Sequence, residues 1–184
     1  MLRLLFITAG PTPWDEEDRL VGSSPLPLTP EATSRIEQEA ASLAEPPSRV
    51  LAPMANEACA QAAQIIAARF EIKPRDEPEL EEMNLGLWEG LTRPDLRFRY
   101  PTSFPQWEEN PLPVVPPDGE SLPAVIERLG GVIAKLKRRK KKELSVLVLR
   151  PMALQVVAGI LRGEQPAEIA AHLHKIAPVA TIDV

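Results

Sequence analysis

The sequence predicts an α/β fold built on buried parallel strands. Two apolar runs carry this prediction: Leu4 to Ile7, which leads into Thr8-Ala9-Gly10, and Leu144 to Leu149, which ends at Arg150-Pro151. Continuous apolar residues are typical of strands buried on both faces, as parallel strands are. Because open α/β sheets place ligands beyond the carboxyl ends of their central strands, we expect the residues after Ile7 to line the functional site.

Composition limits the classes of protein to which the chain could belong. With 184 residues, 44% hydrophobic and 26% charged, we expect a single domain over residues 1–184. One cysteine and two histidines cannot form a disulfide or a Cys/His metal cage, so we expect no metal and no cofactor. No segment reaches the ~18 apolar residues of a membrane helix, so we expect a cytoplasmic protein without a membrane partner.

The net charge of -5 argues against a nucleic-acid partner. The run from Lys135 to Lys142, however, is basic at every position except Leu136. We interpret it as a solvated helix face, and the alternative is an electrostatic site for nucleic acid or anionic lipid.

The first part of the chain predicts a long loop followed by a helix, a strand and a second helix. Pro11 to Pro30 is acidic and rich in proline, which is typical of a loop. Thr29 is suitably placed as the N-cap of a helix that runs to Glu45. Arg49 to Leu51 is a short strand candidate, and the Ala-rich stretch from Asn56 to Phe70 has helical spacing.

The middle of the chain predicts little regular structure. Phe70 to Lys73 is at most a short edge strand, because charge and proline flank it. Leu80 to Thr92 is expected to be a loop held by buried Leu85 and Trp88. Tyr100 to Pro117 contains six prolines and no sustained period, so it is predicted to be irregular.

The last part alternates helices and strands. Ser121 is the expected N-cap of the first helix, and Gly163 is the expected end of the second. The predicted elements are a helix from Leu122 to about Lys141, a strand from Leu144 to Leu149, helices from Met152 to Leu161 and from Ala167 to Lys175, and a strand from Val179 to Val184.

Four motifs follow one another along the chain in an order typical of one enzyme family. They are Thr8-Ala9-Gly10, Thr12-Pro13-Trp14-Asp15, the run from Glu82 to Thr92 (EMNLGLWEGLT), and Asp118-Gly119-Glu120-Ser121. They resemble the Arg-His-Gly, Thr-x-Trp-Asn, Glu-Met-Asp-Phe-Gly-x-Trp-Glu-Gly-Leu-Thr and Gly-Gly-Glu-Ser motifs of the histidine phosphatase superfamily. The resemblance covers nearly the whole chain and implies a phosphoglycerate mutase-like, three-layer α/β sandwich, with helices on both faces of a mostly parallel sheet.

The resemblance also implies a catalytic apparatus, most of which this sequence lacks. The family uses two histidines, two arginines and an acid, because attack on phosphorus needs a neutral imidazole and cations that neutralise the transition state. Four of these positions are occupied here by Thr8, Ala9, Glu82 and Pro151. The fifth lies in the segment Ala52–Ala63, which resembles the family's Ser-Pro-Leu-x-Arg-Ala-x-Gln-Thr-Ala, and holds Ala58 or, in the other register, Asn56. Since only the acid Glu82 is retained, we expect the phosphohistidine reaction to be lost.

Six residues around the former catalytic position are candidates for ligand binding: Thr8, Gly10, Thr12, Glu82, Asn84 and Arg150. Arg150 follows the strongest strand and could form a weak anion site, although we favour an arginine held by neighbouring carboxylates or solvent. Glu82 is expected either in the pocket or in an exposed acidic loop.

Other reactive or aromatic residues are interpreted as structural. His172 and His174 lie two positions apart on a predicted helix, and therefore on different faces. Cys59 suits a packed position in its Ala-rich helix better than the role of a nucleophile. The three tryptophans are expected to anchor loops on the core rather than to frame a substrate pocket: Trp14, Trp88 and Trp107.

Three hypotheses for function follow. The first is a catalytically degenerate histidine phosphatase-like protein, a pseudoenzyme that binds a protein partner or a small anionic ligand through the loops around the former site. The alternative is a phosphatase or other hydrolase with a rebuilt site, in which Glu82 is a general base and Arg150 stabilises an oxyanion. The third is a structural subunit that forms a homodimer through the sheet edge and the segment Tyr100–Pro117.

Overall fold

The computed structural model describes residues 3–138, 143–173 and 181–183. These residues form a five-stranded sheet in the order β3-β2-β4-β1-β5, in which only β5 is antiparallel to its neighbour. The mostly parallel sheet predicted from the sequence is therefore confirmed. The strands are β1 (Arg3–Thr8), β2 (Arg49–Ala52), β3 (Arg75–Asp76), β4 (Leu144–Leu149) and β5 (Thr181–Asp183).

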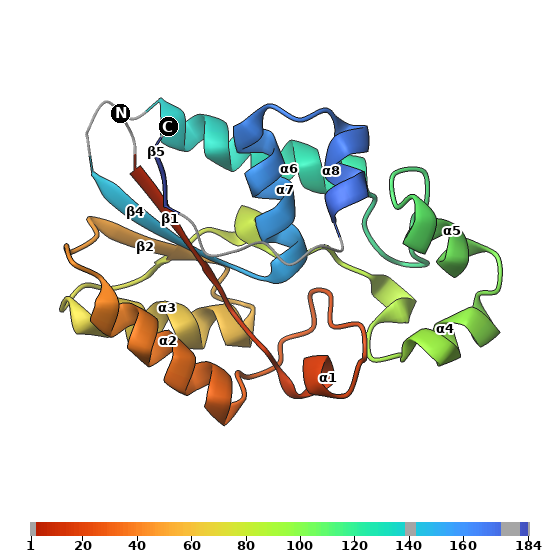
Figure 1. Cartoon of the computed structure of the whole chain (residues 1–184), viewed down its shortest axis with the longest axis horizontal. Coiled ribbons are helices and arrows are strands. Elements are labelled where there is room, and N and C mark those ends of the chain that lie inside the picture. Colours follow the sequence, from red (N-terminus) through yellow and green to blue (C-terminus); the bar gives the residue numbers. More distant parts are fainter. Residues whose placement is uncertain (1–2, 139–142, 174–180, 184) are drawn as a thin grey trace.

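Helices cover both faces of the sheet, which gives the three layers that the family resemblance implied (Figure 1). Helices α2 and α3 cover one face, and α6 and α7 cover the other, with α8 packed on α7. Their bounds are α2 (Pro30–Ser42), α3 (Glu57–Arg69), α6 (Leu122–Lys137), α7 (Pro151–Arg162) and α8 (Pro166–His172).

The central strands contribute side chains to two separate cores. Leu4 and Phe6 of β1 join the core beneath α6 and α7, whereas Leu5 and Ile7 join the core beneath α2 and α3. All four side chains are buried. A strand with a core on each face must be apolar at every position, which explains the continuous apolar run of β1.

The predicted helix starts are confirmed by their caps. Thr29 Oγ1 accepts a hydrogen bond from the backbone N–H of Ala32, and Ser121 Oγ accepts one from Ala124. Gly163 follows α7 with φ 74°, the left-handed conformation expected of a helix-ending glycine. Two helices end earlier than predicted, at Ser42 and Lys137. His174 and the predicted helix end at Lys175 lie outside the described residues, as does the second half of the basic run, residues 139–142.

Five short helical segments and the edge strand were not predicted from the sequence. Residues predicted to be loop form α1 (Pro13–Glu16) and the 3-10 turn η2 (Gly86–Trp88), and the 3-10 turn η1 (Pro78–Leu80) ends at the first residue of the second predicted loop. The segment predicted to be irregular contains α5 (Ser103–Glu109), and α4 (Arg93–Arg99) precedes it. The edge strand is β3 rather than Phe70–Lys73, where the chain turns through Glu71 with φ 55°.

The segment Tyr100–Pro117, predicted to be irregular for its prolines, contains α5 because proline is tolerated in the first turn of a helix, as it is in α4. Pro94 and Pro105 lie in the first turns of their helices, where proline needs no hydrogen-bond donor, so they do not break the helices. Phe104 and Trp107 pack against Trp88, with ring centroids 5.4 and 5.7 Å from the Trp88 ring. Tertiary contact therefore stabilises a helix too short to show a clear period in the sequence.

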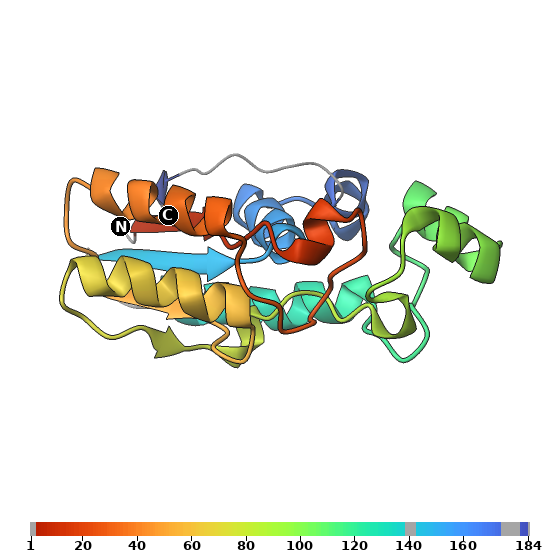
Figure 2. The ribbon, with the colours of Figure 1, turned by 90° about the horizontal axis from the view of Figure 1, so that it is seen from below.

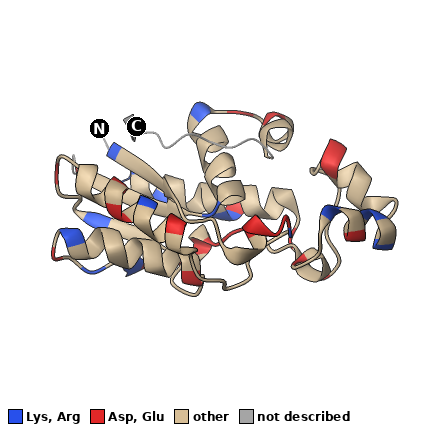
Figure 3. Cartoon of the chain, turned by 60° about the horizontal axis from the view of Figure 1, so that its bottom comes forward, with Lys and Arg blue, Asp and Glu red and all other residues tan. Residues whose placement is uncertain are grey.

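Helices α4 and α5 form a lobe that projects from one end of the body (Figure 2). In the view of Figure 3, Lys and Arg are interspersed with Asp and Glu over the body and this lobe. Within the lobe, Arg93 and Arg97 both pair with Glu108. Among the described helices, none is long and apolar enough to cross a membrane.

Candidate functional site

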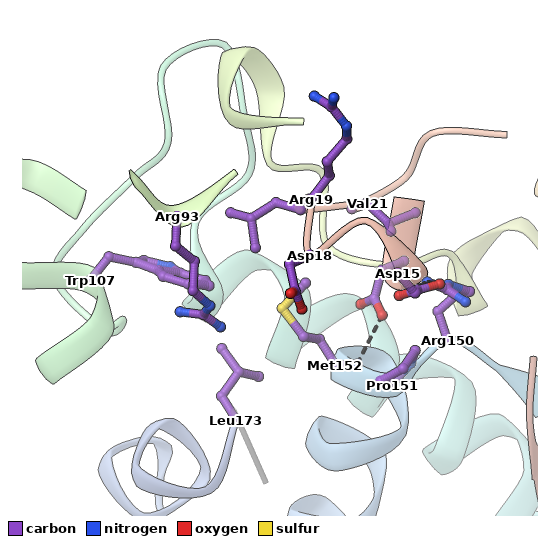
Figure 4. Close-up of a pocket in the computed structure, with 13 residues that line it drawn as sticks. Asp15, Asp18, Arg19, Val21, Arg93, Trp107, Arg150, Pro151, Met152 and Leu173 are labelled. Carbon is purple, nitrogen blue, oxygen red and sulfur yellow. Dashed lines mark hydrogen bonds and ion pairs between the residues drawn. The ribbon is translucent and has the colours of Figure 1, made fainter. Parts of the chain in front are cut away.

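A cavity of about 250 Å³ lies beyond the carboxyl ends of β1 and β4, where the sequence places the functional site (Figure 4). One wall is the loop around α1, and another is the first turn of α7. Arg93 and Trp107 of the lobe also line the cavity, as does Leu173, the residue after α8. The cavity is therefore bounded by the sheet end, the loop after β1 and the lobe.

Arg150 is the residue through which β4 passes into α7, and its side chain is only 3% exposed. Its Nη2 donates to both carboxylate oxygens of Asp15, at 3.0 and 2.9 Å, and its Nη1 donates to the carbonyl oxygen of Ala9 at 2.6 Å. The guanidinium lies directly against Gly10, which has φ 138° and where any Cβ atom would collide with Arg150 Nη1. The expectation that a carboxylate holds Arg150 is confirmed.

The Asp15 carboxylate is oriented by its own helix as well as by Arg150. Its Oδ2 accepts hydrogen bonds from the backbone N–H of Thr12 at 2.6 Å and from Thr12 Oγ1 at 2.7 Å. This is the capping box that begins α1. Asp15 therefore links the loop after β1 to the residue that ends β4.

Glu82 is buried, with 2% exposure, and its carboxylate lies at the first turn of α7. Oε1 accepts from the backbone N–H groups of Met83 at 2.8 Å and Ala153 at 2.9 Å, and Oε2 accepts from that of Met152 at 2.8 Å. Burial raises the pKa of Glu82 to about 7, although these three donors and Arg150 oppose the rise. Of the two locations considered for Glu82, the structure supports the pocket.

The segment that carries Glu82 is held by Arg128 of α6. Arg128 Nη1 donates to the carbonyl oxygens of Glu79 at 2.9 Å and Glu81 at 2.8 Å, while Nε and Nη2 grip both carboxylate oxygens of Glu120. Glu120 belongs to the Asp-Gly-Glu-Ser motif found in the sequence. The motif therefore does not line the cavity, and instead Glu120 positions Arg128, which holds the segment that carries Glu82.

Glu89 holds the loop after α1 against the segment before η2. Its Oε1 accepts from the backbone N–H groups of Ser23 and Leu85, at 2.9 and 3.0 Å, and its Oε2 accepts from Ser24 Oγ. Gly22 packs so closely on this carboxylate that a Cβ atom would collide with it. Glu89, which the sequence motif contains but which we had given no role, thereby shapes one wall of the cavity.

The two positions at which the resemblance implies catalytic histidines hold no imidazole. Ala9 is buried at the end of β1, and its N–H donates to the carbonyl oxygen of Leu149 at 2.8 Å. Pro151 is the first residue of α7, and Ala58 is buried in α3. Thr8 stands at the former arginine position, and its carbonyl oxygen accepts from Arg35 at 2.7 Å.

Of the six predicted ligand-binding residues, Glu82 and Arg150 line the cavity, and the other four do not. Thr8 and Gly10 accept from Arg35 through their carbonyl oxygens, and the Thr12 hydroxyl donates to Asp15 Oδ2. Asn84 is exposed, and its Oδ1 accepts from the N–H of Gly86. Ligand binding by all six residues stays a prediction, and the four outside the cavity wall use these polar groups in contacts within the protein.

Sequence reasoning missed most of the cavity wall, including Asp15, Asp18, Arg19 and Arg93. Asp15 lay within a recognised motif, but the sequence contains no signal that it pairs with Arg150. Arg19 donates to Glu17 and to the carbonyl oxygen of Gly90, so loop contacts determine its position. The lobe residues were missed because α4 and α5 were not predicted.

The residues interpreted as structural lie mostly away from the cavity. His172 ends α8, and its Nδ1 is 3.5 Å from Glu164 Oε2. Cys59 is buried in α3, and burial raises the pKa of its thiol far above the usual value, which leaves it protonated and inert. Trp88 lies in the core as expected, whereas Trp107 both packs there and lines the cavity. Within the described residues, no three or more His, Cys, Asp or Glu side chains are grouped as metal ligands.

Comparisons with known proteins place this arrangement in a family. A relative in Hydrogenobacter thermophilus, phosphoserine phosphatase 1, is 25% identical over 167 residues, which cover 89% of this chain and 77% of that protein. The crystal structure of the alpha-ribazole phosphatase from Shigella flexneri matches with a TM-score of 0.84 at 22% identity, covering 91% of this chain and 83% of that one. A mycobacterial glucosyl-3-phosphoglycerate phosphatase matches with a TM-score of 0.82 at 22% identity, covering 93% and 87%.

The two structures share the fold at an identity too low to transfer an activity. The family model of the histidine phosphatase superfamily (branch 1) matches residues 4–183, which is nearly the whole chain. The chain therefore belongs to the histidine phosphatase superfamily.

Proposed function

We propose that this member of the superfamily binds a ligand in the cavity without phosphohistidine chemistry. The observation that carries the proposal is the identity of the residues at the two histidine positions, Ala9 and Pro151, neither of which can attack phosphorus. The described residues that line the cavity include no His, Cys, Ser or Thr that could replace them. In this proposal the fold is retained as a scaffold for recognition.

The alternative is a phosphatase or other hydrolase that uses a rebuilt site. The relative that is 25% identical is named a phosphoserine phosphatase, and this favours the alternative over a non-catalytic protein. One feature of the site also favours it, because Glu82 has a pKa raised to about 7 and could take a proton from water near neutral pH. Arg150 would then stabilise the developing negative charge, for which it would have to leave Asp15.

A turnover assay separates the two proposals. Purified protein is incubated with p-nitrophenyl phosphate and with phosphoserine, and the release of phosphate is compared between the wild type and Glu82→Gln. The non-catalytic proposal expects the same background from both proteins. Glu127→Gln, an exposed change on α6, is the matched control. Turnover by the wild type and by Glu127→Gln that Glu82→Gln abolishes would overturn this proposal and establish the rebuilt site.

A further inference from the structure

The cavity contains an arginine, Arg150, that already binds a carboxylate of the same chain. Arg150 carries a permanent positive charge, and its side chain is only 3% exposed. It donates hydrogen bonds to both carboxylate oxygens of Asp15. Its remaining nitrogen, Nε, is buried and has no hydrogen-bond partner among the described residues. A buried guanidinium with only part of its donors used has unused capacity for an anion.

The second feature of the cavity that attracts anions is the first turn of α7, and a side chain of the protein already binds there. The first turn of α7 presents the N–H groups of Met152 and Ala153, which together with the helix dipole favour a negative charge. Both N–H groups donate to the Glu82 carboxylate, at 2.8 and 2.9 Å. An oxyanion from solution therefore finds these donors already used.

The other two arginines of the cavity wall each pair with a carboxylate, and Arg93 shares its partner Glu108 with Arg97. Arg19 pairs with Glu17 at 2.6 Å, and Arg93 pairs with Glu108 at 2.6 Å. Asp18 lines the same cavity and is exposed, and its carboxylate forms no hydrogen bond or ion pair with any described residue. Asp15 and Asp18 are thus two carboxylates of one cavity, of which only Asp15 contacts an arginine.

We infer that Asp15 is a built-in anion that sets the ligand specificity of the cavity: while it holds Arg150, free oxyanions such as phosphate and sulfate are excluded. Removing its charge opens an oxyanion site on Arg150. The inference rests on the proposed function in placing the ligand in this cavity. It narrows the ligand classes expected from the sequence, because a small anion must displace Asp15 before it can bind.

The variant Asp15→Asn tests this inference with little change of shape. The asparagine Oδ1 can still accept the Thr12 N–H and retain the cap of α1, while the amide no longer neutralises Arg150. We expect inorganic phosphate to bind Asp15→Asn about tenfold or more tightly than it binds the wild type, since a charge-assisted hydrogen bond becomes available. The measurement is isothermal titration calorimetry with phosphate at constant ionic strength, with chloride as the competing anion.

Asp18→Asn is the matched control, because it removes the same charge from the same cavity without touching Arg150. We expect its phosphate affinity to stay within about twofold of the wild type. An equal gain in Asp18→Asn would attribute the effect to net charge and overturn the inference. So would an unchanged affinity in Asp15→Asn, or a gain that persists in Asp15→Asn/Arg150→Gln.

The variant could fail to fold, since Asp15→Asn leaves a buried charge without its partner. In that case the measurement is refolding in phosphate against refolding in sodium chloride of equal ionic strength. Recovery of folded protein in phosphate alone supports the inference, and failure in both overturns it. Catalytic turnover by the wild type would refute the proposed function and leave this affinity comparison unaffected, so the two can fail separately.

Discussion

At the scale of single residues, the site is governed by two carboxylates in different surroundings. Asp15 is 30% exposed at its side chain and is held by a guanidinium. Glu82 is buried and is held by three backbone N–H groups, which stabilise its charge less than burial destabilises it. The neutral form of Glu82 is therefore favoured in the folded protein up to about pH 7.

The raised pKa of Glu82 predicts a stability that depends on pH. The folded pKa of about 7 exceeds the usual glutamate value of 4.5, so between these values the folded protein holds a proton that the unfolded chain has released. The contribution is fully present below pH 4.5 and is lost as the pH rises through 7. We expect the free energy of unfolding of the wild type, relative to Glu82→Gln, to fall by up to about 3 kcal/mol from pH 5 to pH 8.

Urea denaturation of both proteins at the two pH values measures this difference. Glu82→Gln is the reference because it cannot titrate at this position and retains the other ionisable groups, including Glu81, whose pKa is also raised by burial. A difference that stays constant, or that grows with pH, would contradict the raised pKa.

At the scale of elements, the contacts between α6 and the segment before η2 determine where Glu82 lies. That segment has no regular hydrogen bonding of its own beyond η1, so its carbonyl oxygens depend on Arg128. A planar guanidinium is suited to this arrangement, because it can bind two carbonyl oxygens and a carboxylate at once. The motif residue Glu120 keeps the guanidinium in place.

We predict that Arg128→Lys lowers the free energy of unfolding by about 2 kcal/mol, because one ammonium group cannot satisfy both the carbonyl oxygens and Glu120. The measurement is chemical denaturation at pH 6. Arg162→Lys is the matched control, since Arg162 is exposed and forms an ion pair with Glu164 at 2.6 Å. A surface pair of that kind contributes about 0.5 kcal/mol. Equal losses in the two variants would show that Arg128 does not have the supporting role described here.

At the scale of the whole molecule, the body and the lobe are stabilised in different ways. The body is a sheet with a core on each face. The lobe of α4 and α5 projects beyond it (Figures 1 and 2). Trp88 attaches the lobe through aromatic contacts with Tyr100, Phe104 and Trp107. Segments with few packed contacts open locally at a lower free energy than the core.

We predict that Phe104→Ala loosens the lobe more than the body. Amide hydrogen exchange should become faster in α4 and α5 by about tenfold or more, with a smaller change in β1 and β4. The control is Ile36→Ala, which lies in the core between the sheet and α2. In this variant the ratio of the exchange rates in the lobe to those in the sheet should stay as in the wild type. A uniform increase of exchange in Phe104→Ala would show that body and lobe unfold as one unit.

The sequence by itself determined the central strands, the capped helices and the absence of histidine at two positions of the family motif. These features are encoded locally: a strand with a core on both faces is apolar throughout, a cap needs one hydroxyl at one position, and Ala9 lacks an imidazole in any fold. Short elements such as α5 were missed because Trp88, which buries their apolar side chains, lies elsewhere in the sequence.

The tertiary structure alone decided what occupies the site. Asp15 and Arg150 are 135 positions apart, and nothing in either neighbourhood indicates that the two side chains meet. The burial of Glu82 and its contact with the first turn of α7 likewise depend on the path of the chain between them. The sequence tells which residues are charged or donate hydrogen bonds. Whether two such residues pair depends on their distance and burial, which only the folded chain determines.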